Sequence, residues 1–254
     1  MFSWARRRQL IYGTIVFVFL AIVIGVPTYF IFFNTTPTCF DGKLNGNEVD
    51  VDCGGTCERA CSRDVLPEPI VSWARPFSVA RGLHNLVAYV QNPNVNYTAE
   101  PIPYIFLVYD KDNVLLDVRE GYARIPPTKT FPIFEPSFDA GTRQPVKAVF
   151  EFTEPAVWNK YETAKPELEV IDERVLNAST SPTIKATLIN KTINKYTNIE
   201  VVVIVYGKDG NAFAASKTVV DIIRGNSEAP LTFTWPNPFG MEISKVEIIP
   251  KLPI

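Results

Sequence analysis

The residues in this sequence that are best suited to chemistry are its cysteines, and all four lie in one short segment between residues 39 and 61. They are Cys39, Cys53, Cys57 and Cys61. Cysteines clustered in this way outside the cell indicate two disulfides, and the sequence leaves three pairings open. The alternative is a four-cysteine zinc site, whose ligands usually come as two close pairs, whereas Cys39 stands alone. We therefore predict disulfides.

The same segment is rich in the oxygen ligands that calcium prefers. A Ca²⁺ ion takes roughly 6–8 oxygens from carboxylates, amides and carbonyls, and Gly42 and Gly46 would let a tight loop wrap around one ion. The strict EF-hand spacing is absent, and the alternative is a solvated acidic turn. The candidate calcium ligands are Asp41, Asn45, Asn47, Glu48, Asp50 and Asp52. Calcium is the one cofactor that the sequence suggests.

Outside this segment the sequence carries no recognisable catalytic motif. The single histidine, His84, is expected at a surface or a strand edge, and there is no Gly-x-Ser-x-Gly elbow or phosphate-binding glycine loop. The formal net charge of −2 gives no basic surface for nucleic acid. Aromatic residues such as Trp73 and Tyr122 offer stacking platforms for sugars, although such residues more often fill a β core. The sequence thus predicts no enzyme, no catalytic residue and no nucleic-acid partner.

An apolar segment near the N-terminus is long enough to cross a membrane. Arg6, Arg7 and Arg8 precede a run from Leu10 to Phe33 that contains no Asp, Glu, Lys or Arg. About 24 helical residues span roughly 36 Å, against a hydrocarbon core of about 30 Å. Because basic residues mark the cytoplasmic side, residues 1–9 are expected inside the cell and the chain after the helix at 10–33 outside it. The alternative, a cleaved signal peptide, needs a small-x-small site that is absent after the run.

Beyond residue 66 the sequence favours β-strands joined by turns, since the chain has 21 prolines and only two methionines. The two halves of this region show the same pattern. Asn92 matches Asn190, Tyr109 matches Tyr206, and a Lys-Asp turn follows each tyrosine. We predict a cysteine-rich segment over 34–66, a β-sandwich over 67–153, a linker over 154–165 and a second β-sandwich over 166–254.

The strand before each of these tyrosines sets the expected register. Phe106 and Val108 in the first half, and Val203 and Val205 in the second, are expected to face a core, with their neighbours facing outward. The predicted fold class is mainly β, with an N-terminal transmembrane helix, a small disulfide-rich segment and two immunoglobulin-like β-sandwich domains.

Three stretches resemble known families. The pattern C-x-D-G-x₂-N-G-x-E-x₂-V-D-C-G-G-x-C-x₃-C, from Cys39 to Cys61, looks like a short cysteine module of bacterial surface proteins. Phe106-Leu-Val-Tyr-Asp110 resembles the FxLYD domain, and Asn92-Pro-Asn94 resembles the related sandwich of late-embryogenesis-abundant type 2 proteins. The second half departs from this pattern, with Tyr206-Gly207 in place of Tyr-Asp. The resemblance implies tandem binding or spacing modules without a shared catalytic site.

These observations predict a non-enzymatic surface or periplasmic protein in the cell membrane. It would contact the lipid bilayer through one helix, keep its N-terminus in the cytoplasm and present tandem β-sandwiches to a protein or cell-envelope partner. The alternative function is an accessory subunit of a bacterial membrane-associated secretion, envelope-assembly or appendage complex. Neither the ligand nor the oligomeric state follows from the sequence.

Overall fold

The computed structural model describes residues 4–33, 37–59, 61, 66–162 and 167–251. The side chains of residues 4–6 and 30–33 fall outside this description, so of the three arginines predicted to set the topology Arg6 is not described, and Arg7 and Arg8 are exposed. The chain divides into two compact units, Met1–Cys57 and Glu58–Ile254.

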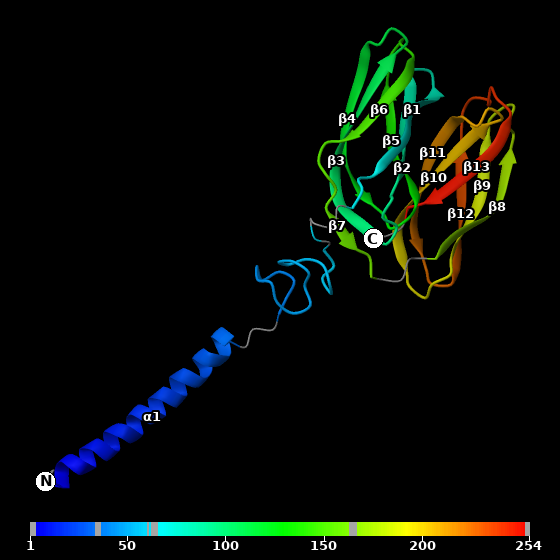
Figure 1. Ribbon diagram of the computed structural model, residues 1–254. Helices are drawn as coiled ribbons and strands as arrows, with labels where there is room; N and C mark the ends of the chain where they lie inside the picture. Colours follow the sequence, from blue (N-terminus) through cyan, green and yellow to red (C-terminus); the bar gives the residue numbers. More distant parts are fainter. Residues whose placement is uncertain (1–3, 34–36, 60, 62–65, 163–166, 252–254) are drawn as a thin grey trace. The chain divides into compact units, whose positions relative to one another are not determined.

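The first unit begins with helix α1, Trp4–Phe33, drawn in blue in Figure 1. All of its described side chains are exposed, and the stretch Arg7–Tyr29 is long and apolar enough to span a membrane. The hydroxyls of Thr14 and Thr28 donate to the carbonyls of Leu10 and Ile24, one turn earlier. These bonds satisfy the two hydroxyls inside the helix, as an apolar environment requires.

The second unit begins with a sandwich of two antiparallel sheets. Its strands are β1 (Ile70–Ala80), β2 (Leu83–Gln91), β3 (Tyr97–Asp110), β4 (Leu115–Ile125), β5 (Thr130–Asp139), β6 (Pro145–Phe152) and β7 (Trp158–Lys160). One sheet has the order β1-β2-β5, and the other has the order β4-β3-β6, with β7 paired to the start of β3. Strand β7 lies within the segment predicted as a linker, and Trp158 is buried in the first core.

A second sandwich follows with the same topology. Its strands are β8 (Leu168–Leu176), β9 (Thr183–Asn190), β10 (Tyr196–Gly207), β11 (Ala212–Ile223), β12 (Ser227–Thr234) and β13 (Ile243–Pro250). The sheet order β12-β9-β8 corresponds to β5-β2-β1, and β11-β10-β13 corresponds to β4-β3-β6. The predicted fold class, mainly β with an apolar N-terminal helix, disulfides and β-sandwiches, is confirmed.

Alternate residues of the central strands β3 and β10 form the two cores. Phe106 and Val108 are fully buried in the first core, and Val203 and Val205 are fully buried in the second, as the register predicted. The expectation that their neighbours face solvent is wrong for β10. Ile204, for example, is 0% exposed. The reason is that the outer face of β10 is covered by the first sandwich.

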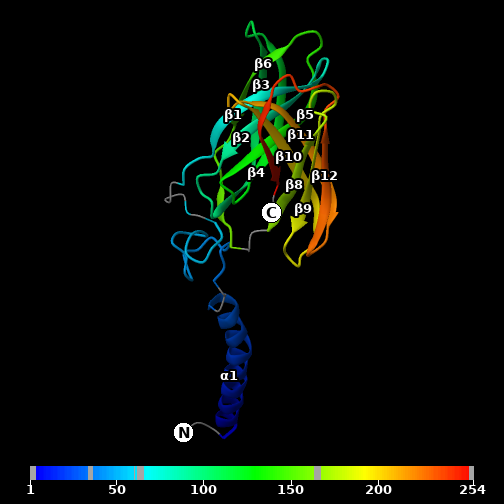
Figure 2. The same cartoon turned by 90° about the vertical axis from the view of Figure 1, so that its right-hand side faces the viewer.

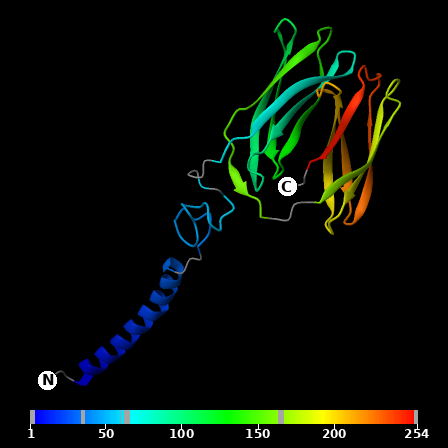
Figure 3. The ribbon, with the colours of Figure 1, turned by 45° about the vertical axis from the view of Figure 1, so that its right-hand side comes forward.

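The two sandwiches lie side by side and share a third buried cluster (Figures 1 and 3). It joins the outer face of the β1-β2-β5 sheet to the outer face of the β11-β10-β13 sheet. In Figure 2, which is turned by 90°, the strands of the two sandwiches overlap in the view. Its buried members are Phe77, Val87, Val202, Ile204, Ala212 and Ala215. Four sheets therefore stack in the order β4-β3-β6, β1-β2-β5, β11-β10-β13 and β12-β9-β8.

Candidate functional site

The cysteine segment is oxidised, as predicted. A disulfide of 2.04 Å joins Cys39 to Cys57, and Cys53 and Cys61 are disulfide-bonded as well. The described part of the chain contains no free cysteine. Cys57 and Cys61 are each 2% exposed, so in a short segment the bridges themselves form most of the interior.

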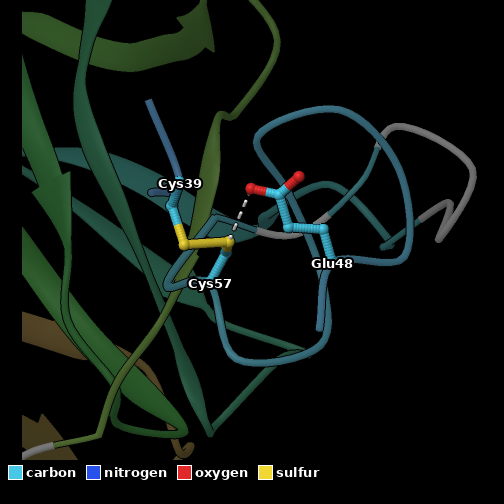
Figure 4. A group of neighbouring side chains, drawn as sticks. All are labelled: Cys39, Glu48 and Cys57. Atoms are coloured by element: carbon cyan, nitrogen blue, oxygen red, sulfur yellow. Dashed lines mark hydrogen bonds between the residues drawn. A yellow bond between two sulfur atoms is a disulfide. The ribbon is translucent and has the colours of Figure 1, made fainter. Parts of the chain in front are cut away.

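Figure 4 shows Glu48 beside the disulfide, with Oε1 3.5 Å from Cys57 Sγ. Cys39, Glu48 and Cys57 bring three ligand-type atoms within 4.8 Å of one another. The two sulfurs are bonded to each other, however, so neither is a thiolate that can bind a metal. This group is therefore a disulfide with a neighbouring carboxylate.

Close backbone packing explains Gly55, the second of the two glycines after Cys53. A Cβ at Gly55 would lie 1.7 Å from the carbonyl oxygen of Asn47, and Gly55 has a φ of +59°. Only glycine fits such an approach in the left-handed region. The Asp-Cys-Gly-Gly motif thus lets the end of the segment cross its acidic loop.

The acidic side chains of this loop hold its backbone. Both Asp52 carboxylate oxygens accept from the Gly42 N–H, at 3.1 and 3.0 Å, and Asp41 accepts from Lys43 N and Asn45 Nδ2 at 3.0 and 2.9 Å. The Asn45 bond is the largest cause that lowers the pKa of Asp41. Asp41 Oδ2 also accepts from Thr38 N at 3.4 Å, whereas Asp41 Oδ1 and each Asp52 oxygen accept one of these bonds and keep a lone pair for a cation. Asn45 Oδ1 is buried without a hydrogen-bond partner among the described residues.

Calcium binding by this loop stays a prediction. We expect chelation of calcium to lower the unfolding temperature of the full-length protein, because an ion that binds only the folded state stabilises it. Asp50→Ala combined with Asp52→Ala should abolish the difference, while Glu228→Ala on β12 should leave it intact. Equal unfolding temperatures with and without calcium in the wild type would remove the prediction.

In each sandwich, a buried asparagine at the end of the second strand makes the same set of hydrogen bonds. Asn92 Nδ2 donates to the carbonyls of Tyr97 and Pro126, at 3.1 and 2.8 Å, and Asn94 N–H donates to its Oδ1 at 2.7 Å. Asn190 Nδ2 donates to the carbonyls of Asn194 and Arg224, at 2.7 and 2.9 Å. Its Oδ1 accepts from the Thr192 N–H at 3.0 Å.

Asp110, the last residue of the Phe-Leu-Val-Tyr-Asp sequence, organises the turn after β3. Its Oδ1 accepts from the N–H groups of Asp112 and Val114, both at 2.9 Å, and Arg143 donates to its Oδ2 at 2.6 Å. The bond from Val114, helped by Arg143 and opposed by burial, holds the pKa of Asp110 below its usual value. In the second sandwich Asp209 takes over this role and accepts from Asn211 N at 3.0 Å.

We expect Asp110→Asn to destabilise the protein at pH 7. In the variant, the free energy of unfolding should decrease less as the pH falls. Because the folded state lowers this pKa, the stabilisation by the ionised form is present above the unfolded value of about 3.9 and is lost as the pH falls through the lower folded value. Urea unfolding at pH 7 and pH 3 measures this. The gap between wild type and variant should shrink at pH 3, and a gap of equal size at both pH values would contradict this prediction.

Polar bonds frame the buried contact between the sandwiches. Arg75 donates to Asn211 Oδ1 at 2.8 Å, and its guanidinium lies 5.8 Å from the centre of the Trp73 ring. The hydroxyls of Tyr89 and Tyr206 both donate to Glu247, at 2.9 and 3.0 Å. Burial, reinforced by Glu247, raises the pKa of Tyr206. One carboxylate is thus shared by a tyrosine from each sandwich.

A groove of about 1060 Å³ lies beside this contact and is lined by both sandwiches. Glu200 pairs with Lys217 at 2.9 Å and with Lys251 at 3.1 Å. Burial raises the pKa of Glu200, but the two lysines outweigh it and the pKa is lowered. Tyr104 donates to Glu135 on the opposite wall. The Glu200 pairs lie within the second sandwich and the Tyr104–Glu135 bond lies within the first, while Lys217 Nζ lies 5.7 Å from the centre of the Phe134 ring of the first sandwich and so connects the two walls.

The histidine and the aromatic residues that the sequence singled out differ in how far they are buried. His84 is 6% exposed, so the expected surface position is wrong. Its ring packs 5.6 Å from that of Phe138, and burial lowers its pKa. Trp73 stacks on Tyr89 with ring centres 5.4 Å apart, whereas Tyr122 is 76% exposed. Of the two, Tyr122 is therefore the more accessible as a stacking platform for a sugar.

Comparisons with known proteins do not identify a family for this chain. No family model and no curated protein matches the chain. Red sea bream transglutaminase is 9% identical over 73% of this chain and 29% of its own, with a TM-score of 0.26. Two Bacteroides uniformis structures, beta-glucuronidase and beta-glucuronidase 2, are 11% and 9% identical over 68% and 61% of this chain and 22% of theirs, each with a TM-score of 0.23. The chain spans less than a third of each protein, and likeness at this level carries no argument about function.

Proposed function

We propose that this chain is a membrane-anchored, extracytoplasmic protein without catalytic activity that presents two β-sandwiches as one binding or spacing module. The observation that carries the proposal is the buried contact between the sandwiches, in which Val87 and Ile204 are 0% exposed. Domains joined by an apolar contact of this kind do not move independently, unlike domains joined only by a linker. A rigid pair of sandwiches suits a protein that holds a binding surface away from a membrane.

The shared bonding of Asn92 and Asn190 and the matching sheet orders support the further proposal that the sandwiches are tandem FxLYD-like or late-embryogenesis-abundant type 2-like repeats. In both copies the asparagine side chain bridges two carbonyls of the chain that follows, and one of these lies in the connection after β4 or β11. The oxidised cysteines support a position outside the cytoplasm, since thiols inside most cells stay reduced. The cysteine module's likeness to bacterial surface proteins supports a bacterial source.

The predicted topology is tested with reporters fused after residue 40. We expect alkaline phosphatase, which needs an oxidising compartment, to be active there and green fluorescent protein to be dark. Replacing Arg6, Arg7 and Arg8 with Glu should weaken this orientation, because these are the basic residues that flank the span. An epitope placed before residue 1 should remain on the mature protein. Cytoplasmic fluorescence, or loss of the epitope by cleavage, would overturn the anchored topology.

A membrane pull-down distinguishes this function from the alternative, an accessory subunit of a secretion, envelope-assembly or appendage complex. A complex subunit is expected to co-purify with its partners in fixed stoichiometry from solubilised membranes. A self-sufficient surface module is expected to purify free of stoichiometric foreign subunits and to retain its fold.

A further inference from the structure

The outer face of the β4-β3-β6 sheet matches, residue by residue, the outer face of the corresponding β11-β10-β13 sheet, which is buried in the contact between the sandwiches. Counting back from the matched tyrosines, Leu107 corresponds to Ile204 and Ile105 to Val202. On the neighbouring strands, Val118 pairs with Leu107 as Ala215 pairs with Ile204. In both sandwiches a lysine lies over the matched tyrosine, with Lys147 Nζ 5.7 Å from the Tyr109 ring centre and Lys245 Nζ 5.3 Å from that of Tyr206.

The two faces differ in what covers them. Ile204 and Ala215 are 0% and 1% exposed, whereas Val118 is 41% exposed and Leu107 is half-buried. Val149 of β6 pairs with Leu107 from the other side, so an apolar row crosses all three strands. None of the buried clusters in the described part of the chain includes this row. Strand β3 also carries an unbroken apolar run from Ile105 to Val108, a pattern found in strands that are covered on both faces.

We propose that this face, defined by Ile105, Leu107, Val118 and Val149, binds the same face of a second copy of the chain. Charge supports a pairing in which the strands of the two copies run antiparallel. Glu120 and Glu151 flank Ile105 at one end of the row, and Lys147 flanks Tyr109 at the other. All three charged residues are exposed. A two-fold axis perpendicular to the strands brings the glutamate end of each copy against the lysine end of the other.

The opposite end of the stack does not fit as a partner for this face. There the outer face of β12-β9-β8 carries Lys185 at its centre, paired with Arg174 and Thr232, and all three are exposed. In the first sandwich the corresponding central residue is Val87, which is buried between the sandwiches. Stacking copies head to tail would press Lys185 against Leu107 and bury an unpaired charge. The second copy therefore binds through the same face, which closes the assembly at two chains.

The test is sedimentation velocity on full-length protein in detergent over a range of concentrations. We expect a monomer–dimer equilibrium for the wild type. Leu107→Glu should raise the dissociation constant at least tenfold, which is about 1.4 kcal/mol. The matched control Lys185→Glu, on the other outer face, should leave the constant unchanged. Circular dichroism melts identify any variant whose fold is damaged.

Charge reversal at exposed positions tests the same contact without touching the apolar row. Lys147→Glu and Glu151→Lys should each weaken the dimer, and the double variant should restore it, because antiparallel pairing brings these two positions together across the axis. A wild type that stays monomeric, or a dimer unaffected by Leu107→Glu and by both reversals, would overturn the proposal. The measurement does not depend on the topology or the binding partner, so its failure would leave the proposed function standing.

Discussion

Aspartate in place of Ile204 is expected to separate the two sandwiches and to cost about 3 kcal/mol or more of unfolding free energy, because it places a charge without a partner in an apolar contact. Ile204 is 0% exposed and belongs to the cluster that includes Val87 and Ala215. If the contact opens to relieve the charge, water reaches apolar side chains of both sandwiches, which is also unfavourable. The substitution therefore destabilises the protein by either route.

Differential scanning calorimetry provides a signature beyond the loss of stability. Wild-type residues 58–254 are expected to unfold in one transition, because the shared cluster couples the sandwiches, and Ile204→Asp is expected to split it into two. Val203→Asp, one residue earlier, places the charge in the second core and should unfold that sandwich alone. Lys185→Asp on the outer face of β9 is the matched control and should be nearly silent. One unsplit transition at the wild-type temperature in Ile204→Asp would show that the contact is not stabilising.

The same contact changes what is expected of an isolated second sandwich. A fragment from about residue 165 to 254 has its own core, but it exposes the outer face of β10 that the first sandwich covers in the whole chain. We therefore expect such a fragment to be less stable than the same region in the intact protein and to associate at high concentration. Both sandwiches are complete in strand pairing, and each covers an apolar outer face of the other, since Phe77 and Val87 of the first sandwich are buried in the same cluster as Ile204.

Local patterns were sufficient to predict the elements and their inward faces, and insufficient to predict which distant faces meet. Alternation placed Phe106 and Val203 in their cores because the strand period of two is a local property. The outward position of Ile204 was wrong because its burial depends on Val87, more than a hundred residues away in the chain. The apolar run Val201–Val205 contains this information, since a strand buried on both faces loses its alternation. Read in that way, β10 would have been predicted as a strand between two layers.

The cysteine pairing and the surroundings of His84 were beyond prediction for the same reason. Three pairings of the cysteines are equally compatible with their spacing, and the bond between Cys39 and Cys57 depends on the crossing that Gly55 allows. His84 begins a strand, where sequence alone favours an exposed position, but Phe138 from β5 packs on its ring. In each case the deciding contact is tertiary: for the cysteines it forms when the segment folds over itself, and for His84 it comes from another strand.

The asparagine bridges are expected to show the second largest effect, and equally in both sandwiches. Asn190→Ala removes the donor to the Asn194 and Arg224 carbonyls and the acceptor for the Thr192 N–H. Asn190 is 0% exposed, so water cannot readily replace these bonds. Since each buried polar group left without a partner costs about 1–3 kcal/mol, we expect a loss of about 3 kcal/mol.

Asn92→Ala is the matched variant in the first sandwich, where the side chain is 1% exposed and bridges the Tyr97 and Pro126 carbonyls. It should cost a similar amount, and the two losses should add, because the asparagines share no partner. Asn96→Ala, at an exposed position nearby, serves as the control and should change stability by less than about 0.5 kcal/mol. Urea unfolding of the wild type, the three single variants and the variant that combines Asn92→Ala with Asn190→Ala measures these effects. If one asparagine matters and the other is silent, the bonds they share do not support both sandwiches alike, and the pairing of Asn92 with Asn190 as equivalent residues loses its energetic basis.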